Sequence, residues 1–145
     1  MEANIRVKHI GDLKNINNST KLSIERAVQA TKTNTGMTVV VAINYGGRQE
    51  IVDAVKNIVT DQIAPDDITE STLQKYLYTS HLPDPDLIIR TGGQFRTSNF
   101  LLWQSAYSEY YVTETLWPDF SVENLKEALS TYQNRQRRFG NVEPN

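Results

Sequence analysis

A valine-rich segment, Met37–Ile43, constrains the fold of this chain more than any other stretch of the sequence. It is almost continuously apolar, and turn residues bound it on both sides, at Asn34–Gly36 and Asn44–Gly47. A strand with one face in water alternates apolar and polar residues, whereas a strand covered on both faces is apolar throughout. The segment therefore predicts a buried strand of a parallel sheet.

The segments around this strand alternate between strand and helix patterns. The sequence predicts three further strands, at Ile5–Ile10, Leu87–Ile89 and Glu109–Thr113. It also predicts five helices: from Ser19 or Thr20 to about Lys32, Arg48–Ile63, Pro65–Leu77, Ser98–Trp103 and Ser121–Gly140. Strands that alternate with helices build parallel sheets with helices on their faces. We therefore expect an α/β fold, a mainly parallel sheet flanked by helices, in a single domain over residues 1–145.

The composition is ordinary for a globular domain and excludes several kinds of site. Of the 145 residues, 39% are hydrophobic and 22% charged, and a net charge of -2 provides no overall field for nucleic acid. The chain has no cysteine, which excludes disulfides, thiolate metal sites and a thiol nucleophile. The polar N-terminus lacks the apolar core of a signal peptide, and no apolar run approaches the ~20 residues that span a bilayer. The predicted location is the cytoplasm, with at most peripheral contact with a membrane.

Groups that attract anions gather after the strand at Leu87–Ile89. Arg90 follows the strand directly, the pair Gly92–Gly93 comes next, and Arg96 and Ser98 precede the predicted helix, whose N-terminus adds a positive dipole. Guanidinium groups, a hydroxyl and glycine N–H groups at the end of a strand are the groups that hold a phosphate or diphosphate. A glycine pair alone is more simply a tight turn, but three anion-seeking features within nine residues favour a phosphate site.

Two further features have a structural and a functional interpretation. Glu109 opens the tyrosine-rich strand, where a carboxylate suits Mg²⁺, although the pattern alone favours a surface glutamate. Arg135, Arg137 and Arg138 precede Gly140. They are either cations in a last helical turn with a glycine cap, or an arginine arm that reaches an anion in a partner subunit.

The central motif resembles a known family. Residues 86–109 read Asp-Leu-Ile-Ile-Arg-Thr-Gly-Gly-Gln-Phe-Arg-Thr-Ser-Asn-Phe-Leu-Leu-Trp-Gln-Ser-Ala-Tyr-Ser-Glu, and residues 116–120 read Leu-Trp-Pro-Asp-Phe. Together with Ile43–Arg48 and Arg137–Gly140, this pattern resembles the cis-prenyltransferases, and most closely the bacterial undecaprenyl diphosphate synthases, or isoprenyl transferases. The resemblance extends over essentially the whole chain from about Ile5.

The resemblance implies an activity and a set of site residues. The activity is the successive condensation of isopentenyl diphosphate onto an allylic diphosphate, with Mg²⁺ and cis double bonds. Arg90, Arg96, Thr97 and Ser98 would bind the diphosphate of isopentenyl diphosphate, and Glu109 would be the metal-associated carboxylate. Arg138 and Gly140 would reach the neighbouring active site across a homodimer.

The chain also departs from the family pattern. Gln94 stands where the family usually has glutamate, and Phe95 where a polar residue is common. The family's Asp-Gly-Asn-x-Arg strand, whose aspartate binds Mg²⁺ and the allylic diphosphate, has no counterpart in Met1–Asp12. The chain thus resembles the C-terminal part of such an enzyme, and no catalytic residue is assigned with certainty.

Three functions remain open on this basis. The first is a prenyltransferase, active as given or together with a separately encoded N-terminal segment, and the isolated chain is expected to be inactive or nearly so. The second is a truncated subunit that binds a diphosphate or a partner chain and performs no chemistry. A general phosphate- or nucleotide-binding module is disfavoured by the length of the motif match. The residues present do not specify the allylic substrate or the product length.

Overall fold

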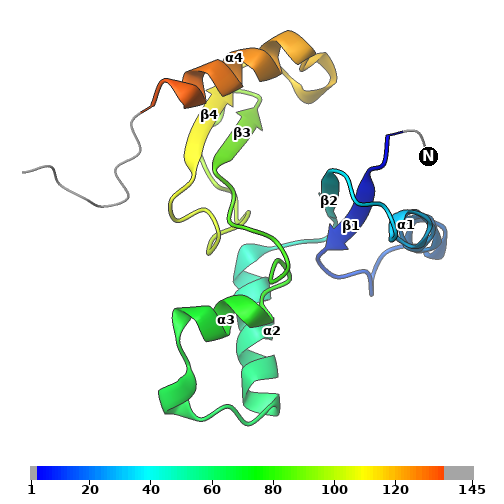
Figure 1. The fold of residues 1–145 in the computed structure, drawn as a ribbon, viewed down its shortest axis with the longest axis vertical. Helices are drawn as coiled ribbons and strands as arrows, with labels where there is room; N and C mark the ends of the chain where they lie inside the picture. Colours follow the sequence, from blue (N-terminus) through cyan, green and yellow to red (C-terminus); the bar gives the residue numbers. More distant parts are fainter. Residues whose placement is uncertain (1–2, 136–145) are drawn as a thin grey trace, which may run out of the picture. The chain divides into compact units, whose positions relative to one another are not determined.

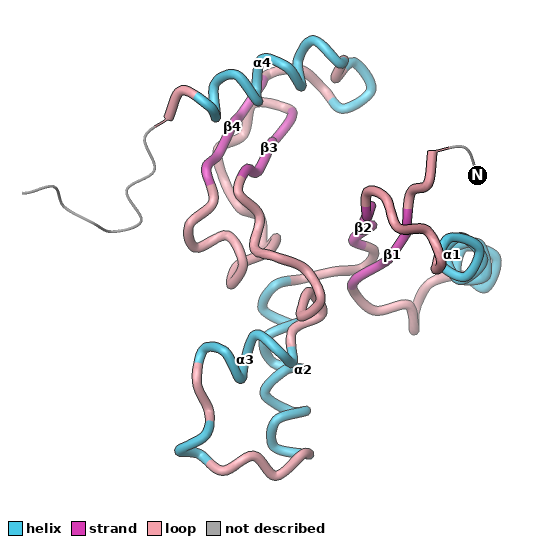
Figure 2. The backbone as a smooth tube through the Cα atoms, in the orientation of Figure 1, coloured by secondary structure: helices cyan, strands magenta, loops and turns pink. Residues whose placement is uncertain are grey.

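The computed structural model describes residues 3–135, and the chain divides into two compact units, Met1–Pro83 and Asp84–Asn145. Figure 1 shows the elements in sequence order, and Figure 2 shows them by type. Each unit contains a two-stranded parallel sheet with a helix packed against it, α1 (Asn18–Thr31) in the first unit and α4 (Val122–Gln133) in the second. The predicted α/β class with parallel strands is therefore confirmed, and the single domain stays a prediction. Within residues 3–135, no helix is both long and apolar enough to cross a membrane.

The first unit begins with a strand, a helix and a parallel strand. β1 (Arg6–Ile10) pairs with β2 (Thr38–Ala42), and α1 (Asn18–Thr31) connects them and packs against β1. The helix is capped by Asn17, whose side chain accepts a hydrogen bond of 2.8 Å from the backbone N–H of Thr20. The predicted cap at Ser19 or Thr20 is therefore wrong, because an asparagine just upstream already satisfies the free N–H.

β2 is less covered than its apolar sequence predicts. The side chains of Val39 and Val41 are 37% and 44% exposed, and β2 pairs with β1 alone among the described residues. The prediction of a strand buried on both faces is therefore wrong for the described part of the chain. An apolar run indicates that a strand prefers to be covered, but neighbouring elements must provide the cover.

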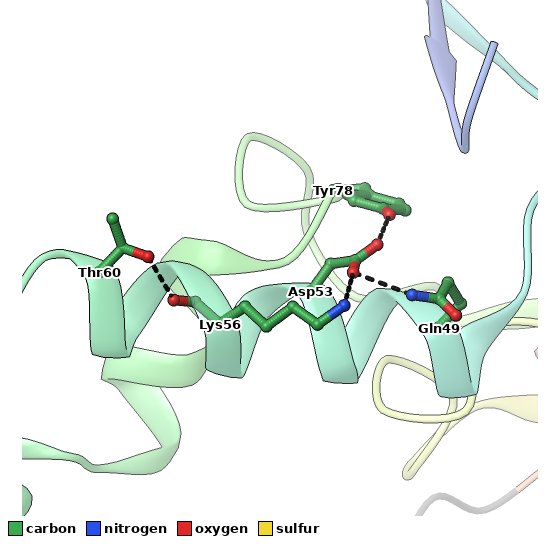
Figure 3. A network of polar contacts seen from close by, with 5 residues as sticks. All are labelled: Gln49, Asp53, Lys56, Thr60 and Tyr78. Atoms are coloured by element: carbon green, nitrogen blue, oxygen red, sulfur yellow. Dashed lines mark hydrogen bonds and ion pairs between the residues drawn. The ribbon is translucent and has the colours of Figure 1, made fainter. Parts of the chain in front are cut away.

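The rest of the first unit is helical. α2 (Gly47–Thr60) packs against α3 (Glu70–Tyr76), and a single 3₁₀ turn (Pro65–Asp67) lies between them. The segment after α3 is tied back to α2 by Tyr78, whose hydroxyl donates a hydrogen bond of 2.6 Å to Asp53 (Figure 3). Gln49 and Lys56 also donate hydrogen bonds to Asp53, at 2.9 and 3.3 Å. These hydrogen bonds lower the pKa of Asp53, and the bond from Tyr78 contributes most.

The second unit contains the strand at the centre of the motif. β3 (Leu87–Thr91) pairs in parallel with β4 (Glu109–Thr113), with Leu87 opposite Glu109 and Thr91 opposite Thr113. A 3₁₀ turn (Trp117–Asp119) leads to α4 (Val122–Gln133), which packs against β4. Ser121 caps α4 in a capping box with Asn124, which confirms the predicted start of this helix.

The helix predicted after Ser98 is wrong. Residues 98–107 form a series of bends and turns instead. Ser98, Asn99 and Leu101 have φ values of 50°, 62° and 46°, in the left-handed region that a right-handed helix excludes. No helix N-terminus therefore stands at Ser98, and its positive dipole contributes nothing to the site.

Candidate anion-binding site

Arg90 and Ser98 come together in the structure although eight residues separate them in the sequence. β3 carries Arg90 near its end, and the guanidinium Nη1 donates a hydrogen bond of 3.2 Å to the Ser98 hydroxyl. The same nitrogen also donates to the backbone carbonyl of Arg96. The Nε atom of Arg90 is buried and has no hydrogen-bond partner within residues 3–135. These bonds fix the guanidinium and fold the turn containing Ser98 back onto it.

A pocket of about 180 Å³ lies beside this guanidinium. Four of its lining residues are cationic or polar, and four are apolar or aromatic. The first group is Arg90, Arg96, Thr97 and Ser98, and the second is Ile88, Ile89, Phe100 and Tyr110. The pocket is smaller than the ~300–1,000 Å³ that accommodates a drug-sized ligand. Its size and mixed lining suit a small molecule that joins an anionic group to a short apolar tail.

The second guanidinium of the pocket has a neutral partner. Arg96 donates from Nη1 to the side-chain oxygen of Gln94 over 3.2 Å. A hydrogen bond to an amide orients a guanidinium without neutralising its charge. Arg96 therefore offers the pocket an undiminished positive charge.

The glycine turn contributes shape instead of hydrogen-bond donors. The N–H of Gly92 donates to the carbonyl of Thr115 at 3.0 Å, and the N–H of Gly93 donates to that of Thr113 at 2.9 Å. These bonds tie the turn to the end of β4, so the predicted use of both N–H groups for an anion is wrong. Both glycines have positive φ, 84° and 71°, and the Glu114 carboxylate occupies the space that a Cβ on Gly93 would need.

Glu109 lies away from this pocket. The register places it opposite Leu87, whereas Arg90 lies opposite Val112, three residues or about 10 Å further along the strands. Side chains alternate between the two faces of a strand. Tyr110, the next residue, lies opposite Ile88 and so shares a face with Arg90, and the alternation assigns Glu109 to the other face.

That other face is the one that α4 covers. α4 packs against β4, and burial together with the neighbouring Glu127 carboxylate of α4 raises the pKa of Tyr111. Glu109 makes an ion pair with Arg135 just beyond the end of α4, with 2.6 Å between Oε2 and Nη1. Both observations place the carboxylate of Glu109 on the side of the sheet where α4 packs, near the C-terminal end of that helix.

The described residues do not fit a magnesium site on their own. Mg²⁺ requires a near-octahedral shell of oxygen ligands. Residues 3–135 contain no group of three or more histidine, aspartate or glutamate side chains that could hold a metal ion. The carboxylate of Glu109 is already neutralised by Arg135. Its role as a metal ligand therefore stays a prediction.

The remaining predicted residues, Arg138 and Gly140, lie outside the described residues. Sequence reasoning assigned Arg135 to a last helical turn, but α4 ends at Gln133 and Arg135 lies beyond it. The Arg135–Glu109 pair joins residues 26 apart. Opposite charges in the sequence were the only signal for this pair, and such charges are too common to predict a contact.

Comparisons with known proteins agree on one family. The prenyltransferase family model, described as undecaprenyl diphosphate synthase, matches residues 1–140. The isoprenyl transferase of Clostridium perfringens (strain 13 / Type A) is 49% identical over 142 residues, which cover 95% of this chain and 56% of that protein. The ditrans,polycis-undecaprenyl-diphosphate synthase ((2E,6E)-farnesyl-diphosphate specific) of Micrococcus luteus is 45% identical over 146 residues, 98% of this chain and 59% of its own length.

Two solved structures are also similar. The lavandulyl diphosphate synthase of Lavandula x intermedia, in complex with dimethylallyl diphosphate, has a TM-score of 0.93 at 37% identity and covers 97% of this chain and 62% of its own. A probable undecaprenyl diphosphate synthase from Campylobacter jejuni has a TM-score of 0.84 at 35% identity, and the match covers 97% of this chain and 65% of that one. The chain thus spans a little over half the length of the curated relatives named above.

Proposed function

This chain belongs to the undecaprenyl diphosphate synthase family of prenyltransferases, and on that premise we propose that it carries the isopentenyl diphosphate site of a cis-prenyl chain-elongating enzyme. That enzyme would condense isopentenyl diphosphate onto an allylic diphosphate. The name of the Micrococcus relative refers to farnesyl diphosphate, and the Lavandula structure contains dimethylallyl diphosphate. Both are allylic diphosphates, which supports the proposed second substrate.

The observation that carries this proposal is the pocket at the end of β3. Its two guanidiniums, Arg90 and Arg96, bring positive charge to one side of a small cavity, and the hydroxyls of Thr97 and Ser98 add neutral partners for phosphate oxygens. Isopentenyl diphosphate joins a diphosphate to a five-carbon tail, which matches the mixed lining and the volume of about 180 Å³. A long polyprenyl chain would exceed this pocket.

The part these residues play is binding and orientation. Arg90 is held by the Ser98 hydroxyl and the Arg96 carbonyl before any ligand arrives. A cation that is already oriented loses little conformational entropy when a diphosphate binds. Anchoring the diphosphate leaves the apolar end of the substrate free to meet the allylic partner.

Magnesium is proposed for the assembled enzyme and not for this chain alone. The family belongs to a class that generally uses Mg²⁺, whose chemistry is to neutralise diphosphate oxygens. The described residues offer no complete set of ligands, so further oxygen ligands would have to come from outside residues 3–135. The family resemblance makes Glu109 the candidate ligand within this chain. It also supports a homodimer in which Arg138 and Gly140 contribute to the neighbouring site.

A second candidate function is a subunit that binds diphosphate without turnover. The observation that favours it is that residues 3–135 contain no group of three or more histidine, aspartate or glutamate side chains that could hold a metal ion. Both functions require the pocket at Arg90 and Arg96. They differ only in whether a complementing segment restores chemistry.

Calorimetric titration of the full chain with isopentenyl diphosphate tests the pocket directly. Replacing Arg96 with alanine removes a charge-assisted hydrogen bond of about 1.5–3 kcal/mol, so the affinity should fall by roughly 10-fold to 150-fold. Arg26→Ala, which removes an exposed arginine from α1, is the matched control and should leave the affinity unchanged. Equal affinities for the wild type and Arg96→Ala would contradict the proposal.

A further inference from the structure

Phe95 stands in water next to the pocket at the end of β3. Its side chain is 81% exposed, the highest value among the exposed large hydrophobic side chains of residues 3–135. The backbone N–H of Arg96 donates to the carbonyl of Gln94 over 3.1 Å, which makes Phe95 the central residue of a three-residue turn. The bond between the side chains of Gln94 and Arg96 closes the same turn a second time. The turn therefore presents Phe95 at its tip.

The ring of Phe95 contacts the lining of the pocket. It packs against the ring of Tyr110 with 6.1 Å between the ring centroids and an angle of 60° between the ring planes. This edge-to-face arrangement is one that aromatic pairs prefer. Tyr110 belongs to β4 and lines the pocket together with Arg96. Phe95 therefore extends the aromatic lining outwards, to the rim of the pocket.

An aromatic ring at this rim responds to only one part of a diphosphate ester. The face of the ring carries negative charge, so it offers the diphosphate no attraction. A hydrocarbon tail gains when it leaves water for the surface of an exposed ring, and the ring gains as well. The guanidiniums of the pocket thus suit the anionic end of a ligand, whereas the ring of Phe95 suits its carbon atoms.

We propose that Phe95 and Tyr110 form an aromatic rim that recognises the hydrocarbon tail of the substrate. Phe95 is then a specificity-determining residue, which makes the pocket prefer isopentenyl diphosphate to diphosphates without a tail. The inference rests on the proposed function, because it requires Arg90 and Arg96 to hold the diphosphate end. Within that site the two arginines supply affinity for the anion, and the rim supplies the preference for the tail.

Calorimetric titration of the full chain with two ligands tests the rim. Isopentenyl diphosphate and methyl diphosphate carry the same charged group and differ in the length of the tail. Phe95→Ser should weaken the binding of isopentenyl diphosphate by about 2-fold to 10-fold, the range for one aromatic contact, and leave that of methyl diphosphate unchanged. Phe95→Tyr keeps the ring and should bind both ligands like the wild type. Val59→Ser, which replaces a residue of α2 that is 69% exposed, is the control and should change neither affinity.

Proton NMR of the ligand gives a second measurement. Protons that lie over the face of an aromatic ring resonate upfield of their position in water. The methyl signal of isopentenyl diphosphate should move upfield on binding to the wild type and to Phe95→Tyr, and it should move less on binding to Phe95→Ser. A change that only loosened the turn would lower the affinity for both ligands and would not remove this shift from the bound ligand.

Three results would overturn the rim. They are equal losses for both ligands in Phe95→Ser, unchanged affinities in that variant, and a wild type that binds methyl diphosphate as tightly as isopentenyl diphosphate. The proposed function fails by a different result, which is equal affinity for isopentenyl diphosphate in the wild type and in Arg96→Ala. If Arg96→Ala loses affinity and Phe95→Ser does not, the diphosphate site stands and the rim does not.

Discussion

The guanidinium of Arg96 donates a hydrogen bond of 3.2 Å to the side-chain oxygen of Gln94, a partner without charge. The family pattern that the motif resembles implies glutamate at this position. A glutamate here would form an ion pair with Arg96 and compete with an anionic ligand for it. On this geometry, we predict that the glutamine at position 94 favours anion binding.

Gln94→Glu should therefore lower the affinity of the chain for inorganic diphosphate. A new exposed ion pair stabilises by about 0.2–1 kcal/mol, which predicts a loss of up to about 5-fold, and the loss should shrink as salt is added. Gln94→Ala removes the hydrogen bond without adding charge and is the control. Calorimetry that finds Gln94→Glu binding as tightly as Gln94→Ala at low salt would contradict this prediction.

The turn at Gly92 and Gly93 allows a matched pair of substitutions. Both residues have left-handed φ, so alanine at either position should lower the free energy of unfolding by about 1–2 kcal/mol. Only at Gly93 would the new Cβ also displace the exposed carboxylate of Glu114. Urea denaturation should therefore show that Gly93→Ala lowers the free energy of unfolding somewhat more than Gly92→Ala does. Adding Glu114→Ala to Gly93→Ala should reduce this loss to that of Gly92→Ala. If the two glycine variants still differ in their free energy of unfolding after Glu114→Ala is added, the Glu114 carboxylate is not the cause of the difference.

Tyr78→Phe should raise the pKa of Asp53 towards its ordinary value. The hydroxyl of Tyr78 is the main cause of the lowered pKa of this carboxyl. A lowered pKa in the folded state stabilises the protein above the unfolded value of about 3.9, and this stabilisation is lost as the pH falls through the folded value. At pH 7 the substitution should cost about 1 kcal/mol, because Asp53 is partly screened by water.

Carbon-13 NMR titration of Asp53 measures this effect. Tyr76→Phe is the matched control, since the Tyr76 hydroxyl donates to Asp61 and not to Asp53. The pKa of Asp53 should rise in Tyr78→Phe and stay constant in Tyr76→Phe. The loss of stability in Tyr78→Phe should also fade as the pH falls through the lowered folded-state pKa of Asp53, because the carboxyl is then protonated in the wild type and in the variant alike. If the loss of stability in Tyr78→Phe persists unchanged in strong acid, the substitution acts through packing and not through the pKa of Asp53.

The isolated chain should show no Mg²⁺-dependent incorporation of labelled isopentenyl diphosphate onto farnesyl diphosphate, or very little. The reason is that the described residues supply no cluster of carboxylates for the metal. Product should appear when an N-terminal segment with the family's Asp-Gly-Asn-x-Arg strand is added. Robust turnover by this chain alone would refute the prediction, and binding without turnover in the complemented sample would favour the non-catalytic subunit.

Light scattering over a concentration series should show a homodimer. Tyr107 and Trp117 are 67% and 75% exposed, and aromatic side chains of this kind are enriched in interfaces. Trp117→Ser should weaken association, whereas Lys32→Ser, a polar change at the end of α1, should not. A monodisperse monomer at tens of micromolar would reject the dimer.

Local patterns were sufficient where each element depends on its own residues. The apolar runs predicted the strands now described as β1, β2, β3 and β4, and Ser121 predicted the start of α4. The periodic apolar stripe predicted α2. These features follow from backbone preferences and side-chain spacing, which are contained in a window of a few residues. The family motif likewise depends on residue order alone.

Only the tertiary structure decided what each site residue faces. Apolar residues after Ser98 have the composition of a helix, yet the bonds from Arg90 to Arg96 and Ser98 hold that segment in turns. The glycine N–H groups at 92 and 93 bond to the end of β4 because the two strands run in parallel register. Glu109 meets Arg135 because the alternation of β4 turns it towards α4. Such contacts join residues far apart in sequence, and their energy depends on which surfaces the fold brings together.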